Sequence, residues 1–196
     1  MIESSTPPLA VLDDYRNVTD LLIARAATAP DHVAFEVAGL IEVAEADAGA
    51  SASWRPVTTR AFSDQVRALA KGLIAQGVQT GDPIAIMAPT RYEWAVADLA
   101  SWFAGAVVVP IYETSSPSQV SAIVADAGVR LAIGGTAAHA ALLREALAQT
   151  SGETLGAWTM DAAASGTLSD LVALGADVTD EELEARRTSA TQDDPA

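Results

Sequence analysis

Short apolar segments alternate with longer amphipathic segments through the middle of this 196-residue sequence. The apolar segments are uninterrupted runs, which are typical of strands buried on both faces of a parallel sheet. Between them, apolar residues recur every three or four positions, which indicates helices with one buried face. The alternation predicts an α/β domain, in which a mostly parallel sheet carries helices on both faces. The expected strands are 83–88, 107–111 and 130–134, and the expected helices are 59–76, 90–105, 117–127 and 137–149.

Weaker patterns flank this central region. A helix is expected over 18–29, followed by strands 33–37 and 54–58, which form a small β element near the N-terminus around the acidic, alanine-rich segment 44–53. A further strand is expected at 158–160, a short helix at 168–174, and a charged helix after a Thr179–Glu182 capping box. The chain therefore divides into an N-terminal arm (1–17), an α/β region (18–187) and a C-terminal linker (188–196).

Three helix starts are expected to be capped by threonine or asparagine side chains. Thr59 is placed to cap the helix that it begins, either Asn17 or Thr19 to cap the first helix, and Thr90 and Glu93 to form a reciprocal capping box. Gly77 follows the helix that starts at Thr59, where a glycine ends a helix by adopting a left-handed conformation.

Charge and cysteine content exclude several classes of function. Acidic residues outnumber basic residues 26 to 11, and the net charge of −15 repels nucleic-acid phosphates and anionic lipid headgroups. The absence of cysteine excludes disulfides, thiolate metal sites and cysteine nucleophiles. The N-terminus lacks the positive charge and the apolar run of a signal peptide. We therefore expect a cytoplasmic protein that does not bind nucleic acid.

The candidate acid–base residues each have a structural explanation. His32 and His139 are isolated and lack metal-ligand spacing. Asp98 interrupts an apolar helix face, where a structural hydrogen bond is favoured over a catalytic carboxylate. Gly134 and Gly135 follow a strand and precede a helix, but no lysine or spaced glycines accompany them as in a phosphate-binding loop. We therefore predict no catalytic, cofactor-binding or metal-binding residue.

The hydroxyl-rich stretch after the strand 107–111 has two parts. Ser116, Pro117 and Gln119 have the spacing of a capping box with proline in the first helical turn. Tyr112, Glu113 and Thr114 lie just past the carboxyl end of the strand, where open α/β sheets bind ligands. These three residues are the candidates for contact with a substrate. No histidine adjacent in sequence is available to activate a serine or threonine as a nucleophile.

The order of these features from about residue 18 onward resembles the N-terminal region of adenylate-forming enzymes, the acyl-CoA synthetase superfamily. Several short segments carry the resemblance together, and none is diagnostic alone. They are Thr59, Gly77 to Asp82, Glu93-Trp94, Ala104-Gly105-Ala106, Pro110, Tyr112 and Ser116-Pro117. Residues 91–94, Asp98 and 109–116 are most similar to the long-chain fatty-acid CoA ligases of this superfamily.

The resemblance implies an enzyme that uses ATP and Mg2+ to convert a fatty acid to an acyl-adenylate and then transfers the acyl group to coenzyme A (CoA). In that family, the phosphate-binding loop follows shortly after the equivalent of Asp193-Asp194-Pro195, and the adenine, ribose and catalytic-lysine motifs come later still. None of these motifs maps onto this sequence. We therefore expect residues 18–187 to be the N-terminal subdomain of a long-chain ligase, and 188–196 to lead toward the missing ATP-binding loop.

The resemblance also sets expectations about binding. The chain is expected to be inactive alone, to bind no ATP, Mg2+ or CoA, and to pair with the rest of the same polypeptide. An apolar surface normally covered by that remainder is expected to cause self-association, for example as a homodimer. Whether the full enzyme also contacts membranes peripherally stays open.

Two other interpretations remain open from the sequence. One is a stand-alone, non-catalytic interaction or dimerisation module with the same fold. The other is an unrelated nucleotide-binding α/β module. The acyl chain-length preference does not follow from these residues.

Overall fold

The computed structural model describes residues 15–39, 53–162, 164–191 and 193–195. Its main sheet has four parallel strands in the order β4-β3-β5-β6. The strands are β3 (Pro83–Met87), β4 (Val107–Ile111), β5 (Leu131–Gly134) and β6 (Gly156–Thr159). β4 and β6 are the edge strands, and β3 and β5 lie between them. The parallel α/β sheet expected from the sequence is therefore confirmed.

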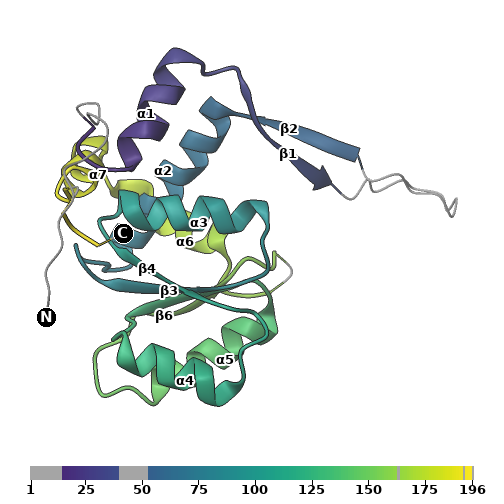
Figure 1. Ribbon diagram of the computed structural model, residues 1–196, viewed down its shortest axis with the longest axis vertical. Coiled ribbons are helices and arrows are strands. Elements are labelled where there is room, and N and C mark those ends of the chain that lie inside the picture. The colour runs from purple at the N-terminus through teal and green to yellow at the C-terminus, as the bar shows by residue number, and fades with distance from the viewer. Residues whose placement is uncertain (1–14, 40–52, 163, 192, 196) are drawn as a thin grey trace, which may run out of the picture.

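Helices cover both faces of this sheet (Figure 1). One layer contains α2 (Thr59–Ala75), α3 (Tyr92–Phe103) and α6 (Leu168–Leu174), and the opposite layer contains α4 (Pro117–Asp126) and α5 (Ala137–Ala148). α1 (Thr19–Thr28), the short 3-10 helix η1 (Gly175–Asp177) and α7 (Asp180–Arg187) pack beside α2 and α3. The antiparallel pair β1 (Val33–Gly39) and β2 (Ser53–Thr58) projects from the first layer, and is the small β element expected from the sequence.

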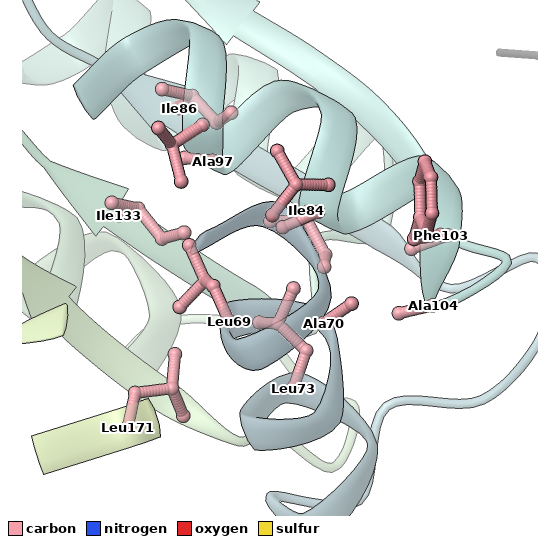
Figure 2. Packing of buried hydrophobic residues seen from close by; sticks show 14 of the residues in the cluster. Leu69, Ala70, Leu73, Ile84, Ile86, Ala97, Phe103, Ala104, Ile133 and Leu171 are labelled. Carbon is pink, nitrogen blue, oxygen red and sulfur yellow. The ribbon is translucent and has the colours of Figure 1, made fainter. Parts of the chain in front are cut away.

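Alternate residues of the strands enter two hydrophobic cores, because successive side chains of a strand point to opposite faces. Ile84 and Ile86 of β3 join the core under α2 and α3, whereas Ala85 and Met87 join the core under α4 and α5. Figure 2 shows part of the first core. Leu69 and Leu73 of α2, Ala97 and Phe103 of α3, and Leu171 of α6 belong to the same buried cluster as Ile84 of β3 and Ile133 of β5.

Two of the expected helix caps are wrong. Thr58 caps α2 by accepting a hydrogen bond from the Ala61 backbone N–H at 3.2 Å, because Thr58 is the last extended residue of β2. Thr59 is buried instead, and its N–H and hydroxyl both donate to the His32 carbonyl oxygen. α3 begins after Arg91 with no side-chain cap, so the Thr90–Glu93 capping box does not form.

A third expected cap, that of α1, is also wrong: Val18 is the N-cap and no side chain caps the helix, while Asn17 Oδ1 accepts from the Thr19 N–H at 3.0 Å. Two other expected helix ends are found in whole or in part. Thr179 caps α7 by accepting from the Glu182 N–H at 3.1 Å, which is one half of the expected capping box. Gly77 follows α2 with φ of 104°, the left-handed conformation predicted for it.

The C-terminal residues contact the beginning of α1. The Asn17 side-chain amide donates to the carbonyl oxygens of Arg187 and Ala190, each at 2.9 Å. The linker over 188–196 stays a prediction, and the arm over 1–17 and the acidic segment 44–53 fall mostly outside the described residues. In the part of the chain that the structure describes, no helix has the length and apolar character needed to span a membrane.

Candidate functional site

The carboxyl ends of the four strands meet at one edge of the sheet, as in any parallel sheet. Tyr112, Glu113 and Thr114 lie directly beyond β4 at this edge, in a turn closed by a 3.0 Å hydrogen bond from the Ser115 N–H to the Tyr112 carbonyl oxygen. All three residues are exposed, and Tyr112, at 82%, is the most exposed large hydrophobic residue in the part of the chain that the structure describes. Their position matches the expectation, and their role in substrate contact stays a prediction.

The hydroxyl groups that follow this turn form the start of α4. The Gln119 N–H donates to Ser116 Oγ at 3.4 Å, and the Ser116 N–H donates to Gln119 Oε1 at 2.8 Å. Pro117 occupies the first turn, where its missing N–H is not needed. The capping box predicted from the sequence is confirmed, and these hydroxyls serve helix formation.

Gly134 and Gly135 provide close packing at the end of β5. A Cβ atom on Gly134 would lie 2.5 Å from the Ala140 backbone nitrogen, and one on Gly135 would lie 2.6 Å from the Ala88 Cβ. The Gly135 N–H donates to the Met87 carbonyl oxygen at 2.8 Å, which ties the ends of β3 and β5 together. The two glycines are therefore explained by the close approach of β3, β5 and α5.

Arg91 is a charged residue at this edge that carries part of the family resemblance but was not expected to be a site residue. Its Nε donates to Glu93 Oε2 at 2.6 Å, and its Nη1 donates to the Gly135 carbonyl oxygen at 3.3 Å. The hydrogen bond with Glu93 raises the pKa of Arg91 and lowers the pKa of Glu93, against the opposing effect of burial on each group. The available signal was the position of Arg91 two residues before the acidic Glu93, in the segment between β3 and α3.

The remaining candidates are dispersed over the fold. His32 is exposed in the loop after α1, and His139 lies in the first turn of α5, where its N–H donates to the Thr136 hydroxyl. His139 Nδ1 is buried without a hydrogen-bond partner among the described residues. Asp98 lies on α3. No cluster of three metal-ligating side chains occurs within the described ranges.

Asp98 lacks the structural hydrogen bond that was expected for it. Its carboxylate is half-buried and forms no hydrogen bond or ion pair with any residue that the structure describes. Burial raises the pKa of Asp98 to about 6, because removing a carboxylate from water disfavours its charged form. Asp98 is therefore an acidic group without a partner in this structure.

Replacing Asp98 by asparagine is expected to stabilise the chain at pH 7.5. The pKa of Asp98 is raised on folding, so ionisation costs stability as the pH rises from the unfolded value near 3.8 through about 6. With a discount for partial solvent exposure, the gain in the free energy of unfolding is about 1 kcal/mol at pH 7.5 and close to zero at pH 4. Urea unfolding of the wild type and of Asp98→Asn at both pH values measures this gain in the free energy of unfolding.

Asp64→Asn, on the exposed face of α2, is the matched control for this change. It is expected to alter the free energy of unfolding by less than about 0.5 kcal/mol. Destabilisation of the chain by Asp98→Asn at pH 7.5 would show that the carboxylate is stabilised in the folded chain.

Two basic side chains that could attract a phosphate are held in ion pairs. Arg91 is already paired with Glu93. Lys71 is the single lysine of the sequence, and its Nζ lies 2.9 Å from an Asp180 carboxylate oxygen. The carboxyl edge as described therefore has Arg91 paired with Glu93 beside the exposed residues Tyr112, Glu113 and Thr114.

The family model for "AMP-binding enzyme" matches residues 22–196. The long-chain-fatty-acid–CoA ligase FadD15 of Mycobacterium bovis is 35% identical over 199 residues, which cover 100% of this chain and 31% of the relative. The corresponding ligase of Mycobacterium tuberculosis has the same identity and coverage. The chain thus spans about a third of the length of these curated relatives.

Solved structures share the fold. A fatty acyl CoA synthetase of Mycobacterium tuberculosis superposes with a TM-score of 0.61 at 22% identity, over 80% of this chain and 28% of that protein. The N-terminal subdomain of NpsA from Klebsiella oxytoca superposes with a TM-score of 0.56 at 21% identity, over 81% of this chain and 32% of that subdomain. The family match and the shared fold extend over most of the sequence, and the chain belongs to the AMP-binding enzyme family.

Proposed function

We propose that this chain forms the N-terminal part of a long-chain fatty-acyl-CoA ligase. The complete ligase converts ATP, a fatty acid and CoA to acyl-CoA, AMP and pyrophosphate through an acyl-adenylate, with Mg2+ on the nucleotide. The observation that carries this proposal is the 35% identity to FadD15 ligases over the whole length of the chain. The exposed turn at Tyr112, Glu113 and Thr114 is the surface that we assign to contact with the substrate.

We also propose that the chain does not catalyse adenylation by itself. Formation of an acyl-adenylate requires cations and backbone donors that stabilise charge on the reacting phosphate. Arg91 at the carboxyl edge and Lys71, the single lysine of the sequence, are both engaged in ion pairs, with Glu93 and Asp180. We therefore propose that the rest of the ligase is the partner that supplies the nucleotide site. We also propose a cytoplasmic location for the protein.

Acid-dependent exchange between ATP and pyrophosphate tests whether the chain is inactive alone. The purified chain is expected to show no exchange above the rate without enzyme when a long-chain fatty acid is added. The intact mycobacterial ligase is the positive control. Robust exchange by the purified chain would show that it contains a complete adenylation site.

A further inference from the structure

The outward side of α3 has an unusual composition for a surface helix. Its outward stripe consists of Ala95, Asp98, Leu99 and Trp102, whose spacing places them on one face of the helix. The opposite face of α3 is buried in the core, where Ala97, Ala100 and Phe103 have no exposed surface. All four residues of the α3 stripe remain partly exposed, although Ala95 and Leu99 also touch the core.

The α3 stripe contains no basic residue, and Asp98 is its only charged residue. The partly exposed face of α2 provides the contrast within the same layer, because it carries Arg60, Asp64, Arg67 and Lys71. A helix that is apolar on most of its circumference is normally covered on most of it. The composition of α3 therefore indicates that its outward side is covered in the working protein.

Two polar groups of the α3 stripe lack partners. The Asp98 carboxylate is half-buried without a hydrogen bond to a described residue, and Trp102 Nε1 is buried without an acceptor among these residues. The two residues are one helical turn apart. Buried polar groups in folded proteins are nearly always hydrogen-bonded, so the buried Trp102 N–H without an acceptor, next to a half-buried carboxylate, indicates an incomplete contact.

We propose that the α3 stripe is the docking surface for the remaining polypeptide of the ligase, which supplies a cation or N–H donor to Asp98 and an acceptor to Trp102. This inference rests on the proposed function. The length of the relatives supports this occupant, because the chain spans 31% of FadD15 and the shared fold spans 32% of the NpsA subdomain. A polypeptide of that length has ample surface to cover one helix.

A second copy of the chain fits the α3 stripe less well. A symmetric contact through the same stripe would bring two Asp98 carboxylates toward each other, and like charges in an interface oppose association. Each copy also carries a net charge of −15, which adds long-range repulsion. Electrostatics therefore favours a different partner with a positive or hydrogen-donating group opposite Asp98.

Binding of this chain to the part of mycobacterial FadD15 outside the matched segment, produced as a separate protein, tests the proposal. Sedimentation velocity is expected to show a one-to-one complex. Asp98→Asn is expected to weaken it about tenfold or more, because a charged interfacial pair is lost. Trp102→Phe keeps an aromatic side chain, removes the N–H donor and is expected to weaken the complex about fivefold.

The isolated chain gives a second readout that a merely structural role of Asp98 would not produce. Asp98→Asn is expected to raise the urea midpoint of the chain alone at pH 7.5 while it weakens the complex, so the two effects have opposite signs. Leu21→Ser, an exposed leucine of α1, is the control and is expected to leave the complex unchanged.

Three results would overturn the proposal. They are the absence of a complex with the wild-type chain, binding of Asp98→Asn and Trp102→Phe as tight as wild type, and a dimer of the chain alone that these variants abolish. Failure of the proposed function is separable, because binding is measured without catalysis. A complex that forms through the stripe and is catalytically inactive would contradict the function and leave the docking surface in place.

Discussion

Replacing Arg187 by alanine is expected to lower the free energy of unfolding by about 3–5 kcal/mol, the usual effect of removing one partner from a buried ion pair. The Arg187 side chain is only 6% exposed. It forms ion pairs with Asp20 and Glu184 and donates to the Thr19 hydroxyl at 2.8 Å. Without the guanidinium, the buried Thr19 hydroxyl and the mostly buried Asp20 carboxylate of α1 lose their donor, whereas Glu184 of α7 is 47% exposed and can still bind water.

The guanidinium of Arg187 also lies over the Phe103 ring, 5.9 Å from its centroid, so the substitution removes contacts with α1, α3 and α7 together. Arg60→Ala is the matched control, because Arg60 is exposed and lies 3.9 Å from Asp31. Exposed pairs of this kind contribute between about 0 and 1 kcal/mol. Urea unfolding at pH 7 measures both variants, and equal losses would show that Arg187 does not hold these helices together.

Acidification should reduce the effect of the Arg187 substitution. The hydrogen bond from Arg187 lowers the pKa of Glu184, and it lowers the pKa of Asp20 even though burial acts in the opposite direction. A carboxylate whose pKa falls on folding stabilises the protein above its unfolded pKa, and this contribution is lost as the pH falls through the folded value. The difference between wild type and Arg187→Ala is therefore expected to shrink below pH 4.

Replacing Gly72 by alanine is expected to destabilise the chain by about 3 kcal/mol, the upper end of what overpacking of a core costs. A Cβ atom at this position would lie 2.2 Å from the Leu171 carbonyl oxygen of α6. A Cβ on Gly175 would in turn lie 2.5 Å from the Gly72 nitrogen. The obstacle is backbone on both sides, so α2 and α6 must separate to admit a methyl group.

Gly152→Ala is the control for Gly72→Ala, because a Cβ atom on Gly152 meets no atom within 4 Å. It is expected to leave stability unchanged or to raise it slightly, since alanine restricts the unfolded chain more than glycine does. Thermal unfolding by circular dichroism compares the two. Similar melting temperatures for Gly72→Ala and wild type would mean that the helices do not cross at this distance.

Features that depend on neighbouring residues were predictable from the sequence. The capping box of Ser116 and Gln119 requires only atoms three residues apart, and the buried strands β3 and β5 are visible as apolar runs. The caps of α2 and α3 were misplaced by one residue or more. At α2, the helix begins where strand β2 ends at Thr58. At α3, the helix begins after the extended residue Arg91, which is ion-paired.

Features that depend on distant residues were not predictable. Arg187 meets Thr19 and Asp20 across more than 160 positions, and no local pattern distinguishes it from Arg186. In the sequence, Gly72 is one glycine within a helix, and its need for a hydrogen in place of a side chain follows only from its contact with α6. At the carboxyl edge, the sequence located Tyr112, Glu113 and Thr114 correctly beyond β4, whereas the contact of Arg91 with Gly135 required the strand order.

A chimeric ligase tests the central claim most directly. In it, this chain replaces the matched segment of FadD15, and acyl-CoA formation is measured with a long-chain fatty acid, ATP, Mg2+ and CoA. We predict acid-dependent formation of acyl-CoA and AMP by the chimera, and none by the chain or the remainder assayed alone. A chimera that is folded and monodisperse but forms no acyl-adenylate would contradict the assignment of this chain to a long-chain fatty-acyl-CoA ligase.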